Sequence, residues 1–407
     1  MAEKLQAPRG TFDVLPEEGP ARLRLHDAAR DLLKHAGYGY FESPVFEDTE
    51  VFARGVGAST DIVQKEMFTF EDKAGRSLTL RPEGTAGVCR AYAEHGMHKR
   101  PQPVKLWYWG PFFRHEAPQA GRFRQFNQVG AEALGSDDPS LDAELILLLN
   151  DLIQRAGVKD VKLRLSSLGN AGTRESYGEE LKTYLREHEG QLSDEVRGRI
   201  DTNPLRAFDA DHPGTKEVMQ GAPLLLDRLA SDDAEHFSAV RELLDGAEID
   251  YDLDPTLVRG LDYYTRTVFE FESGELGAQN ALGGGGRYDG LVEMLGGPAT
   301  PGVGWAAGVE RILMAGGVEA GPSPQVYVSW TKDASTAFQA AIKFRARGVH
   351  AELEQAGRSL KGQLKHADRL GAAYVVFVDD GIELKDMGTG AQRTVESIEE
   401  AIEAIAP

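Results

Sequence analysis

Arginine, glutamate and aromatic side chains recur through residues 104–134. The run VKLWYWGPFF at 104–113 predicts a strand, because aromatic and β-branched residues favour extended backbone. The turn-like APQAG at 117–121 separates it from the alternating run FRQFNQVGAEALG, so the two runs predict a hairpin. Alternate residues of a strand share one face. We therefore expect a shared face of Arg114 and Glu116 before the turn, and Arg122, Arg124, Phe126, Gln128 and Glu132 after it.

Such a face has the chemistry of a site for a nucleotide and an amine. Arginine forks bind phosphates, the Phe126 ring can stack on a purine, and the Glu132 carboxylate can bind a cationic or hydrogen-bonding group. A solvated strand face with surface ion pairs would have the same composition. The hairpin alone favours neither interpretation.

Three further segments carry residues of the same kinds. They are TLRPEGTAG at 79–87, LVRGLDYYTRTVFEF at 257–271 and GVGWAAGVERI at 302–312. Several clusters with complementary chemistry favour a binding site over isolated surface pairs, although an exposed ion pair is the simplest interpretation of the last segment. The side chains concerned are Arg81, Glu83, Thr85, Arg259, Tyr263, Tyr264, Glu310 and Arg311.

Glycine-rich stretches give weaker signals. The chain has no G-x-x-x-x-G-K-[ST] sequence, which excludes a P-loop. The run 302–307 matches a loose dinucleotide fingerprint, and a helix is expected after Gly304 that ends near Ala315. The fingerprint requires a strand before it, and no strand is predicted there. The four glycines at 283–286 allow either close approach of a ligand or a flexible hairpin tip.

The elements around these segments predict two unequal parts. Helices are expected at 17–36 and 141–156, with extended segments at 40–42, 161–167 and 262–272. The stretch 171–250 is rich in helix formers and acidic residues, with 9 Lys+Arg against 19 Asp+Glu, and predicts an inserted helical module. The glycine- and proline-rich run at 316–324 predicts a linker.

Beyond the linker, strand and helix patterns alternate. This order predicts a small α/β domain with a parallel or mixed sheet. Four cations in its second helix, at 358–370, are spaced three, four and four residues apart and therefore share one helix face, opposite Leu360, Leu364 and Ala367. They form either a stripe that can bind nucleic-acid phosphates or an ordinary solvated face. The cations are Arg358, Lys361, Lys365 and Arg369.

Composition limits the class of protein. At one domain per ~150 residues, 407 residues suggest two or three domains. The net charge of −20 argues against non-specific binding to membranes or nucleic acids, although it leaves room for a local basic groove. A single cysteine, Cys89, precludes an intrachain disulfide. Since no signal peptide or long apolar run is found, we expect a cytoplasmic protein with no membrane partner.

Five segments of the chain together resemble the bacterial histidyl-tRNA synthetases, which are class II aminoacyl-tRNA synthetases. FESPVFEDTEVF, containing Pro44, is similar to class II motif 1; FRHEAPQAGRFRQFNQVGAE resembles motif 2 and GVGWAAGVERI motif 3. RGLDYYT at 259–265 and GGGGRYD at 283–289 are similar to the two signatures specific for histidine. The resemblance covers essentially the whole chain.

The resemblance implies an α+β fold. It consists of an antiparallel-sheet catalytic domain at 1–322 with a helical insertion at about 171–250, and a small α/β anticodon-binding domain at 323–407. It also implies a homodimer that uses ATP, Mg²⁺, L-histidine and tRNA(His). Histidine would attack the α-phosphate of ATP to give histidyl-adenylate and pyrophosphate, and the terminal ribose of the tRNA would then take the histidyl group. The Mg²⁺ would be held mainly through ATP rather than by a dedicated protein site.

Residue roles follow from the same resemblance. Arg114 and Arg259 would act in catalysis from opposite sides of the α-phosphate, and both would also contact histidine. The ATP-binding set would be Arg114, Glu116, Arg122, Phe126 and Arg311. The remaining histidine-binding residues would be Glu83, Thr85, Gln128, Glu132, Tyr263, Tyr264 and Tyr288, with Glu132 and Tyr264 holding the two imidazole nitrogens.

Two features depart from the family pattern, and other functions compete. The C-terminal domain is short after residue 380, which puts its last strand and helix in question. The insertion is acidic, although it is implied to lie near tRNA.

The main alternative function is a non-catalytic regulatory subunit of ATP phosphoribosyltransferase, which typically lacks the RGLDYY arginine and the C-terminal domain. A glycine- or proline-specific relative and a non-enzymatic nucleic-acid module fit the residues less well.

Overall fold

The computed structural model describes residues 4–57, 60–116, 121–277, 280–317 and 323–405. The chain forms two compact units, Met1–Glu319 and Ala320–Pro407. The predicted turn at 117–121 and the predicted linker at 316–324 lie mostly outside the described residues. No helix among the described residues is long and apolar enough to cross a membrane.

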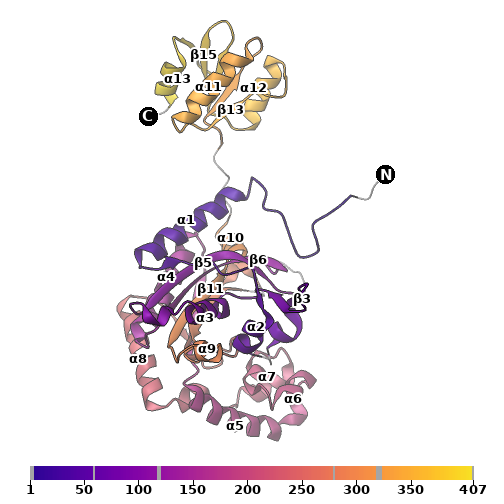
Figure 1. The fold of residues 1–407 in the computed structure, drawn as a ribbon, viewed down its shortest axis with the longest axis vertical. Coiled ribbons are helices and arrows are strands. Elements are labelled where there is room, and N and C mark those ends of the chain that lie inside the picture. Colours follow the sequence, from indigo (N-terminus) through magenta and orange to yellow (C-terminus); the bar gives the residue numbers. More distant parts are fainter. Residues whose placement is uncertain (1–3, 58–59, 117–120, 278–279, 318–322, 406–407) are drawn as a thin grey trace. The chain divides into compact units, whose positions relative to one another are not determined.

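A large sheet forms the centre of the first unit (Figure 1). Its strands, within the described ranges, follow the spatial order β1-β5-β6-β11-β10-β9-β7-β8. The six inner strands are antiparallel, and only the edge strands β1 and β8 run parallel to their neighbours. The strands are β1 (Gly39–Tyr40), β5 (Val104–Phe113), β6 (Gln125–Leu134), β7 (Val161–Ser167), β8 (Asp252–Leu253), β9 (Thr265–Ser273), β10 (Ala281–Arg287) and β11 (Gly302–Gly308).

Helices bury one face of this sheet. The main core joins α1 (Gly19–His35), α4 (Pro139–Arg155), α8 (Ser231–Gly246) and α10 (Val309–Gly316) to inward-facing strand residues. In β6, Val129 and Ala131 point into this core. Because side chains alternate along a strand, Gln128 and Glu132 point to the opposite face. The pleat of β6 thus separates a hydrophobic face from a polar one.

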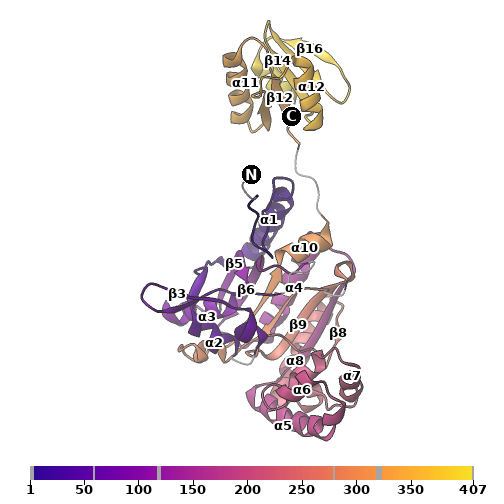
Figure 2. The same ribbon diagram turned by 90° about the vertical axis from the view of Figure 1, so that its right-hand side faces the viewer.

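Shorter elements cover the polar face. A small sheet of β2 (Phe46–Asp48), β4 (Ser77–Leu80) and β3 (Phe68–Glu71) has the order β2-β4-β3. It lies beside α2 (Thr49–Val56), η1 (Ile62–Glu66) and α3 (Thr85–Glu94) (Figure 2). The 3₁₀ turn η2 (Met97–Lys99) follows α3, the turn η6 (Gly274–Leu276) follows β9, and α9 (Leu291–Met294) follows β10.

Residues 171–250 are all described, and every element among them is a helix or a helical turn. In both views α5, α6 and α7 gather at the end of the unit away from α1. Tyr177 and Leu181 anchor this module, since they join the same buried cluster as Tyr264 and Tyr288. The elements are α5 (Ala171–Glu187), η3 (Glu189–Gln191), α6 (Asp194–Arg199), η4 (Pro204–Asp209), α7 (Pro213–Met219), η5 (Leu225–Arg228) and α8.

The second unit is a mixed sheet with helices. Its order is β13-β12-β14-β15-β16; the first three strands are parallel and the last two antiparallel. The last strand and helix, in question from the sequence, are both present within residues 323–405. The elements are β12 (Val326–Ser329), α11 (Ala334–Ala346), β13 (Ala351–Leu353), α12 (Leu360–Arg369), β14 (Tyr374–Val378), β15 (Ile382–Asp386), β16 (Gln392–Val395) and α13 (Ile398–Ile405).

In the glycine-rich segments the structure overturns one sequence-based expectation and excludes one of two open alternatives. Residues 302–308 are the strand β11, and the helix α10 begins only at Val309. The glycines at 283–286 lie inside the central strand β10 rather than at a hairpin tip. A Cβ on Gly285 would lie 1.9 Å from the carbonyl oxygen of Gly304, so these strands pair at a distance that a side chain would prevent. Pairing with neighbouring strands therefore overrides the local helix signal.

Candidate active site

A cavity lies on the polar face of the large sheet. Its walls come from the hairpin, the start of α3, the segment before β9, and strands β10 and β11. Twelve of the residues predicted to bind ATP or histidine line it. They are Glu83, Thr85, Arg114, Glu116, Arg122, Phe126, Gln128, Arg259, Tyr263, Tyr264, Tyr288 and Arg311.

Glu132, the remaining predicted site residue of this unit, lies at the base of the cavity and is fully buried. Thr85 Oγ1 donates to its Oε1 at 2.7 Å, and the Tyr288 hydroxyl donates to its Oε2 at 2.6 Å. The Tyr108 hydroxyl makes a longer contact of 3.4 Å. Burial raises the pKa of Glu132 to about 8, although the hydroxyl donors act in the opposite direction. The carboxyl group therefore takes up and releases a proton near neutral pH.

Glu83 begins the wall formed by α3 (Thr85–Glu94). Its carboxylate accepts hydrogen bonds from the backbone nitrogens of Thr85 and Ala86 at 2.7 and 2.9 Å. These nitrogens lack partners within the helix, so Glu83 satisfies them and is held in place in return. Burial raises its pKa, and the backbone donors oppose that shift. The result is a carboxyl group held in place at the start of a helix, where it can accept hydrogen bonds from an amino group.

Three tyrosines enclose the same end of the cavity. The ring centroid of Tyr263 lies 4.7 Å from that of Tyr264 and 5.8 Å from that of Tyr288. All three side chains are buried, and burial raises the pKa of each phenol. The phenols consequently stay protonated and can donate hydrogen bonds to a ring nitrogen.

Arginines gather at the other end of the cavity. Arg114 lies over the Phe126 ring, 5.3 Å from its centroid, and its Nε donates to the carbonyl oxygen of Pro82 at 2.9 Å. Glu116 lies between two cations, 3.1 Å from Arg122 and 3.9 Å from Arg114. Arg311 lines the same part of the cavity. Such a set suits a polyanion beside a ring that stacks on Phe126.

Arg259 is largely buried and comes from the segment before β9. It pairs with Glu270 of β9, and Glu270 also lies 3.7 Å from Arg164. The Arg259 Nε is buried without a hydrogen-bond acceptor among the described residues. The buried Oε1 of Gln128 likewise has no donor within that part of the chain. An unsatisfied buried donor and an unsatisfied buried acceptor at one cavity indicate a site that binds a polar ligand.

The sequence analysis missed Glu270 and misjudged Glu310. Glu270 of β9 pairs with Arg164 of β7. The signal that could have found it is the alternation of acidic and apolar residues in VFEFE, together with the basic residue of LRL in the other strand. Glu310 does not form an exposed pair with Arg311. It is buried, forms an ion pair with Arg22 at 2.7 Å, and accepts the backbone N–H of Asn127 at 2.9 Å.

The basic stripe of the smaller unit is only partly free. Lys361, Lys365 and Arg369 are exposed on α12. Arg358 precedes the helix and pairs with the buried Glu354 at 3.1 Å. Leu360, expected on the apolar side of the helix, is 45% exposed. Three cations rather than four therefore remain available to a polyanion.

Comparisons with known proteins agree with this geometry. The sequence model described as Histidyl-tRNA synthetase matches residues 10–312, and that described as Anticodon binding domain matches residues 325–406. The chain belongs to the histidyl-tRNA synthetase family. As a member of this class II family it is an aminoacyl-tRNA ligase.

Relatives within the histidyl-tRNA synthetase family align over nearly the whole chain. The histidine–tRNA ligase of Rubrobacter xylanophilus is 48% identical over 95% of this chain and 96% of its own. That of Halothermothrix orenii is 45% identical over the same shares. The apo histidyl-tRNA synthetase of S. aureus superposes with a TM-score of 0.82 at 35% identity, covering 99% of this chain and 100% of the other.

Proposed function

We propose that the cavity residues of this chain catalyse histidine–tRNA ligation in two steps. Histidine attacks the α-phosphate of ATP, pyrophosphate leaves, and the histidyl group passes from the adenylate to the terminal ribose of tRNA(His). The observation that carries the proposal is the assembly of twelve predicted residues, from five separate segments, around one cavity. A surface array of ion pairs would have no reason to converge in this way.

Arg114 and Arg259 are the proposed catalytic residues. They come from different segments of the cavity wall and would contact the α-phosphate from two sides. Negative charge on the phosphoryl oxygens would then be stabilised by two guanidinium groups as bonds form and break. In the structure Arg259 is paired with Glu270, so ATP would compete with that carboxylate for the guanidinium. Arg122 and Arg311 would hold the far end of the triphosphate, while Glu116 and Phe126 would contact the adenine.

Histidine would bind between α3 and the three tyrosines. Glu83, supported by Thr85, would take the α-amino group, and the free oxygen of Gln128 would accept a further hydrogen bond from the substrate. Glu132 and Tyr264 would hold the two imidazole nitrogens. A buried carboxylate and a phenol of this kind reject side chains that cannot form both hydrogen bonds, by factors of about 10⁴–10⁵ in comparable sites.

Mg²⁺ would enter with ATP. Among the described residues, no group of three or more His, Cys, Asp or Glu side chains is placed to hold a metal ion by itself. Mg²⁺ in proteins commonly takes one or two carboxylates and completes its shell with phosphate oxygens and water. Glu270 is a carboxylate on the cavity wall that fits this arrangement. Bound there, the ion would neutralise charge on the phosphates.

The remaining partners follow from surfaces outside the cavity. The cations of α12 would contact tRNA phosphates. A homodimer is supported by a set of exposed apolar side chains on β1, β2 and β3 and the loop before β2, because monomers rarely expose such groups together. These side chains are Tyr40, Val45, Phe46 and Phe70. We place the enzyme in the cytoplasm, where translation takes place and where its one free cysteine stays reduced.

The decisive experiment is ATP–pyrophosphate exchange with purified protein, Mg²⁺ and each of the twenty amino acids in turn. Exchange that depends on histidine alone is the expected result. Exchange with a different amino acid would retain the class II chemistry and overturn the roles of Glu132 and Tyr264. No exchange with any of them would favour the regulatory-subunit alternative.

A further inference from the structure

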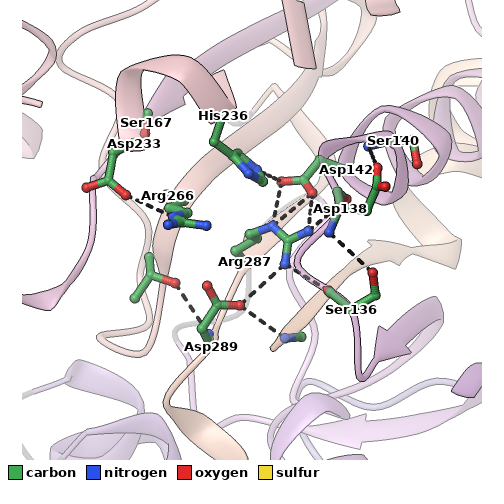
Figure 3. Close-up of polar contacts among 12 residues, drawn as sticks. Ser136, Asp138, Ser140, Asp142, Ser167, Asp233, His236, Arg266, Arg287 and Asp289 are labelled. Atoms are coloured by element: carbon green, nitrogen blue, oxygen red, sulfur yellow. Dashed lines mark hydrogen bonds and ion pairs between the residues drawn. The ribbon is translucent and has the colours of Figure 1, made fainter. Parts of the chain in front are cut away.

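A buried polar network adjoins the histidine pocket without lining it. Its centre is Arg287, whose side chain is fully buried, and its neighbour is Asp142 of α4, which is also fully buried. Figure 3 shows Asp142 between Arg287 on one side and His236 of α8 on the other. The proposed two-step reaction assigns no role to any of these three side chains.

The guanidinium of Arg287 has all its donors engaged. It makes a two-pronged contact with Asp142, with Nε to Oδ2 at 2.9 Å and Nη2 to Oδ2 at 2.7 Å. Its other hydrogens point to the carbonyl oxygens of Ser136 and Asp138, at 3.2 and 3.0 Å, and to Asp289 at 3.4 Å. Arg287 is therefore held from several directions.

The network ends on the insertion helix α8. The Nε2 of His236 lies 3.3 Å from the Oδ1 of Asp142. Three residues earlier, and therefore on the same helix face, Asp233 accepts a hydrogen bond from the Nε of Arg266 at 2.8 Å. Arg266 has a φ of 45°, which a residue with a side chain rarely adopts, and the Asp233 contact helps to hold it there.

Both contacts reach residues next to the pocket tyrosines. Arg287 directly precedes Tyr288, and Arg266 lies two residues after Tyr264. Because the two residues are directly bonded, a shift of Arg287 would move the base of the Tyr288 side chain, whose backbone nitrogen donates to the carbonyl oxygen of Gly302 at 2.8 Å. The hydroxyl of that ring makes the 2.6 Å hydrogen bond to Glu132.

We propose that His236 is a positioning residue for the histidine pocket, acting through Asp142 and Arg287 on Tyr288, with Asp233 acting in the same way on the Tyr264 segment through Arg266. The inference rests on the proposed function, because it assigns the insertion helix α8 a part in histidine affinity. It predicts that damage at His236 weakens histidine binding while ATP binding stays intact, since the network ends on the Tyr288 and Tyr264 segments at the histidine end of the cavity.

The test compares three variants in ATP–pyrophosphate exchange. His236→Leu keeps much of the volume and removes the ring nitrogen that faces Asp142; His236→Gln places an amide donor near the same position. Glu235→Gln, at the exposed neighbouring site of α8, is the matched control. We expect His236→Leu to raise the KM for histidine about tenfold, the change that corresponds to ~1.4 kcal/mol, with the KM for ATP unchanged. His236→Gln should restore most of the loss.

Hydrogen exchange measures the same effect without activity. In His236→Leu, the amides of 281–289 should exchange several-fold faster than in the wild type, and those of β14 in the other unit should not change. An equal rise in the KM for both substrates, or unchanged exchange at 281–289, would overturn the positioning role. If the wild type itself shows no histidine-dependent activity, the proposed function fails, and hydrogen exchange alone then decides whether His236 holds the Tyr288 segment.

Discussion

The Tyr288 hydroxyl donates a 2.6 Å hydrogen bond to the carboxylate of Glu132, from a position 156 residues further along the chain. Both groups are buried, one at the end of β10 and the other near the end of β6, with β11 between the two strands. A Cβ on Gly304 of β11 would lie 1.7 Å from the same carboxylate. The glycine at position 304 of β11 therefore leaves the space that the Glu132 carboxylate occupies at the base of the pocket.

Loss of this hydroxyl should weaken histidine binding specifically. We expect Tyr288→Phe to raise the KM for histidine by about 10- to 100-fold, because a hydrogen bond to a charged group contributes about 1.5–3 kcal/mol. The KM for ATP should stay the same. Tyr92→Phe, which removes another buried hydroxyl from the same core cluster, is the control and should leave both constants unchanged. A similar loss in both variants would point to general damage to the core.

Histidine affinity should depend on pH through Glu132. Its pKa is raised to about 8 by burial, while a free imidazole titrates near ~6.5. Between these values the free carboxyl carries one proton and the free imidazole none, which matches the single proton that the bound pair shares. At a pH below this window, binding of histidine must release a proton. At a pH above the window, binding must take up a proton. Affinity should therefore fall on both sides, by at most about tenfold per pH unit.

Calorimetry in buffers of different ionisation enthalpy checks this prediction. Near pH 7.2 little proton exchange should accompany histidine binding, whereas release is expected near pH 6 and uptake above pH 8. In Glu132→Gln the uptake at high pH should disappear. Uptake that persists in that variant would assign the proton to another group.

Arg259 should be needed for chemistry and dispensable for folding. We expect Arg259→Ala to lower the rate of adenylate formation by about 10²–10³, the usual cost of removing one contact to a developing charge. Its circular dichroism and melting temperature should remain close to those of the wild type. Arg76→Ala, in an exposed pair with Asp72, is the control. Near-normal exchange in Arg259→Ala would remove this residue from the mechanism.

The α12 cations should matter for tRNA and for nothing else. Replacing Lys361, Lys365 and Arg369 by alanine should raise the KM for tRNA(His). The slope of log K against log salt concentration should become less steep by ~0.7–0.9 per lost phosphate contact. Pyrophosphate exchange should not change. A triple alanine variant with the same charge loss, at Lys332, Lys343 and Arg393, is the control. Equal effects of both variants would reduce the role of α12 to net charge.

The exposed ring of Phe46 should lie in a dimer interface. It is 50% exposed and contacts Phe70 edge to face, with the ring centroids 6.1 Å apart. Phe46→Asp would bury a charge at that interface, so we expect it to sediment as a monomer where the wild type sediments as a dimer. Leu243→Asp, at an exposed apolar position of α8, should sediment as the wild type does.

Some elements are predictable because their signal is local. The strands at 104–113 and 161–167 have the predicted limits, since the first is rich in aromatic residues and the second alternates apolar with polar residues. The helix predicted at 17–36 is α1, Gly19–His35, and Gly37 follows it with a φ of 85°. By contrast, GVGWAAG at 302–308 has small residues without a clear period, and its extended form comes from pairing with β6 and β10.

The sequence by itself determined the chemistry of this protein. Its motifs carry the arginines, carboxylates and phenols of the cavity, and the resemblance they support identified the family, because residue type and spacing persist within one segment. Only the tertiary structure decided which of these groups meet. The placement of Glu132 beneath Thr85 and Tyr288 and the chain of contacts from His236 to Arg287 both join segments distant in sequence. No local pattern encodes such contacts, since they arise from the register of strands and the docking of helices onto the sheet.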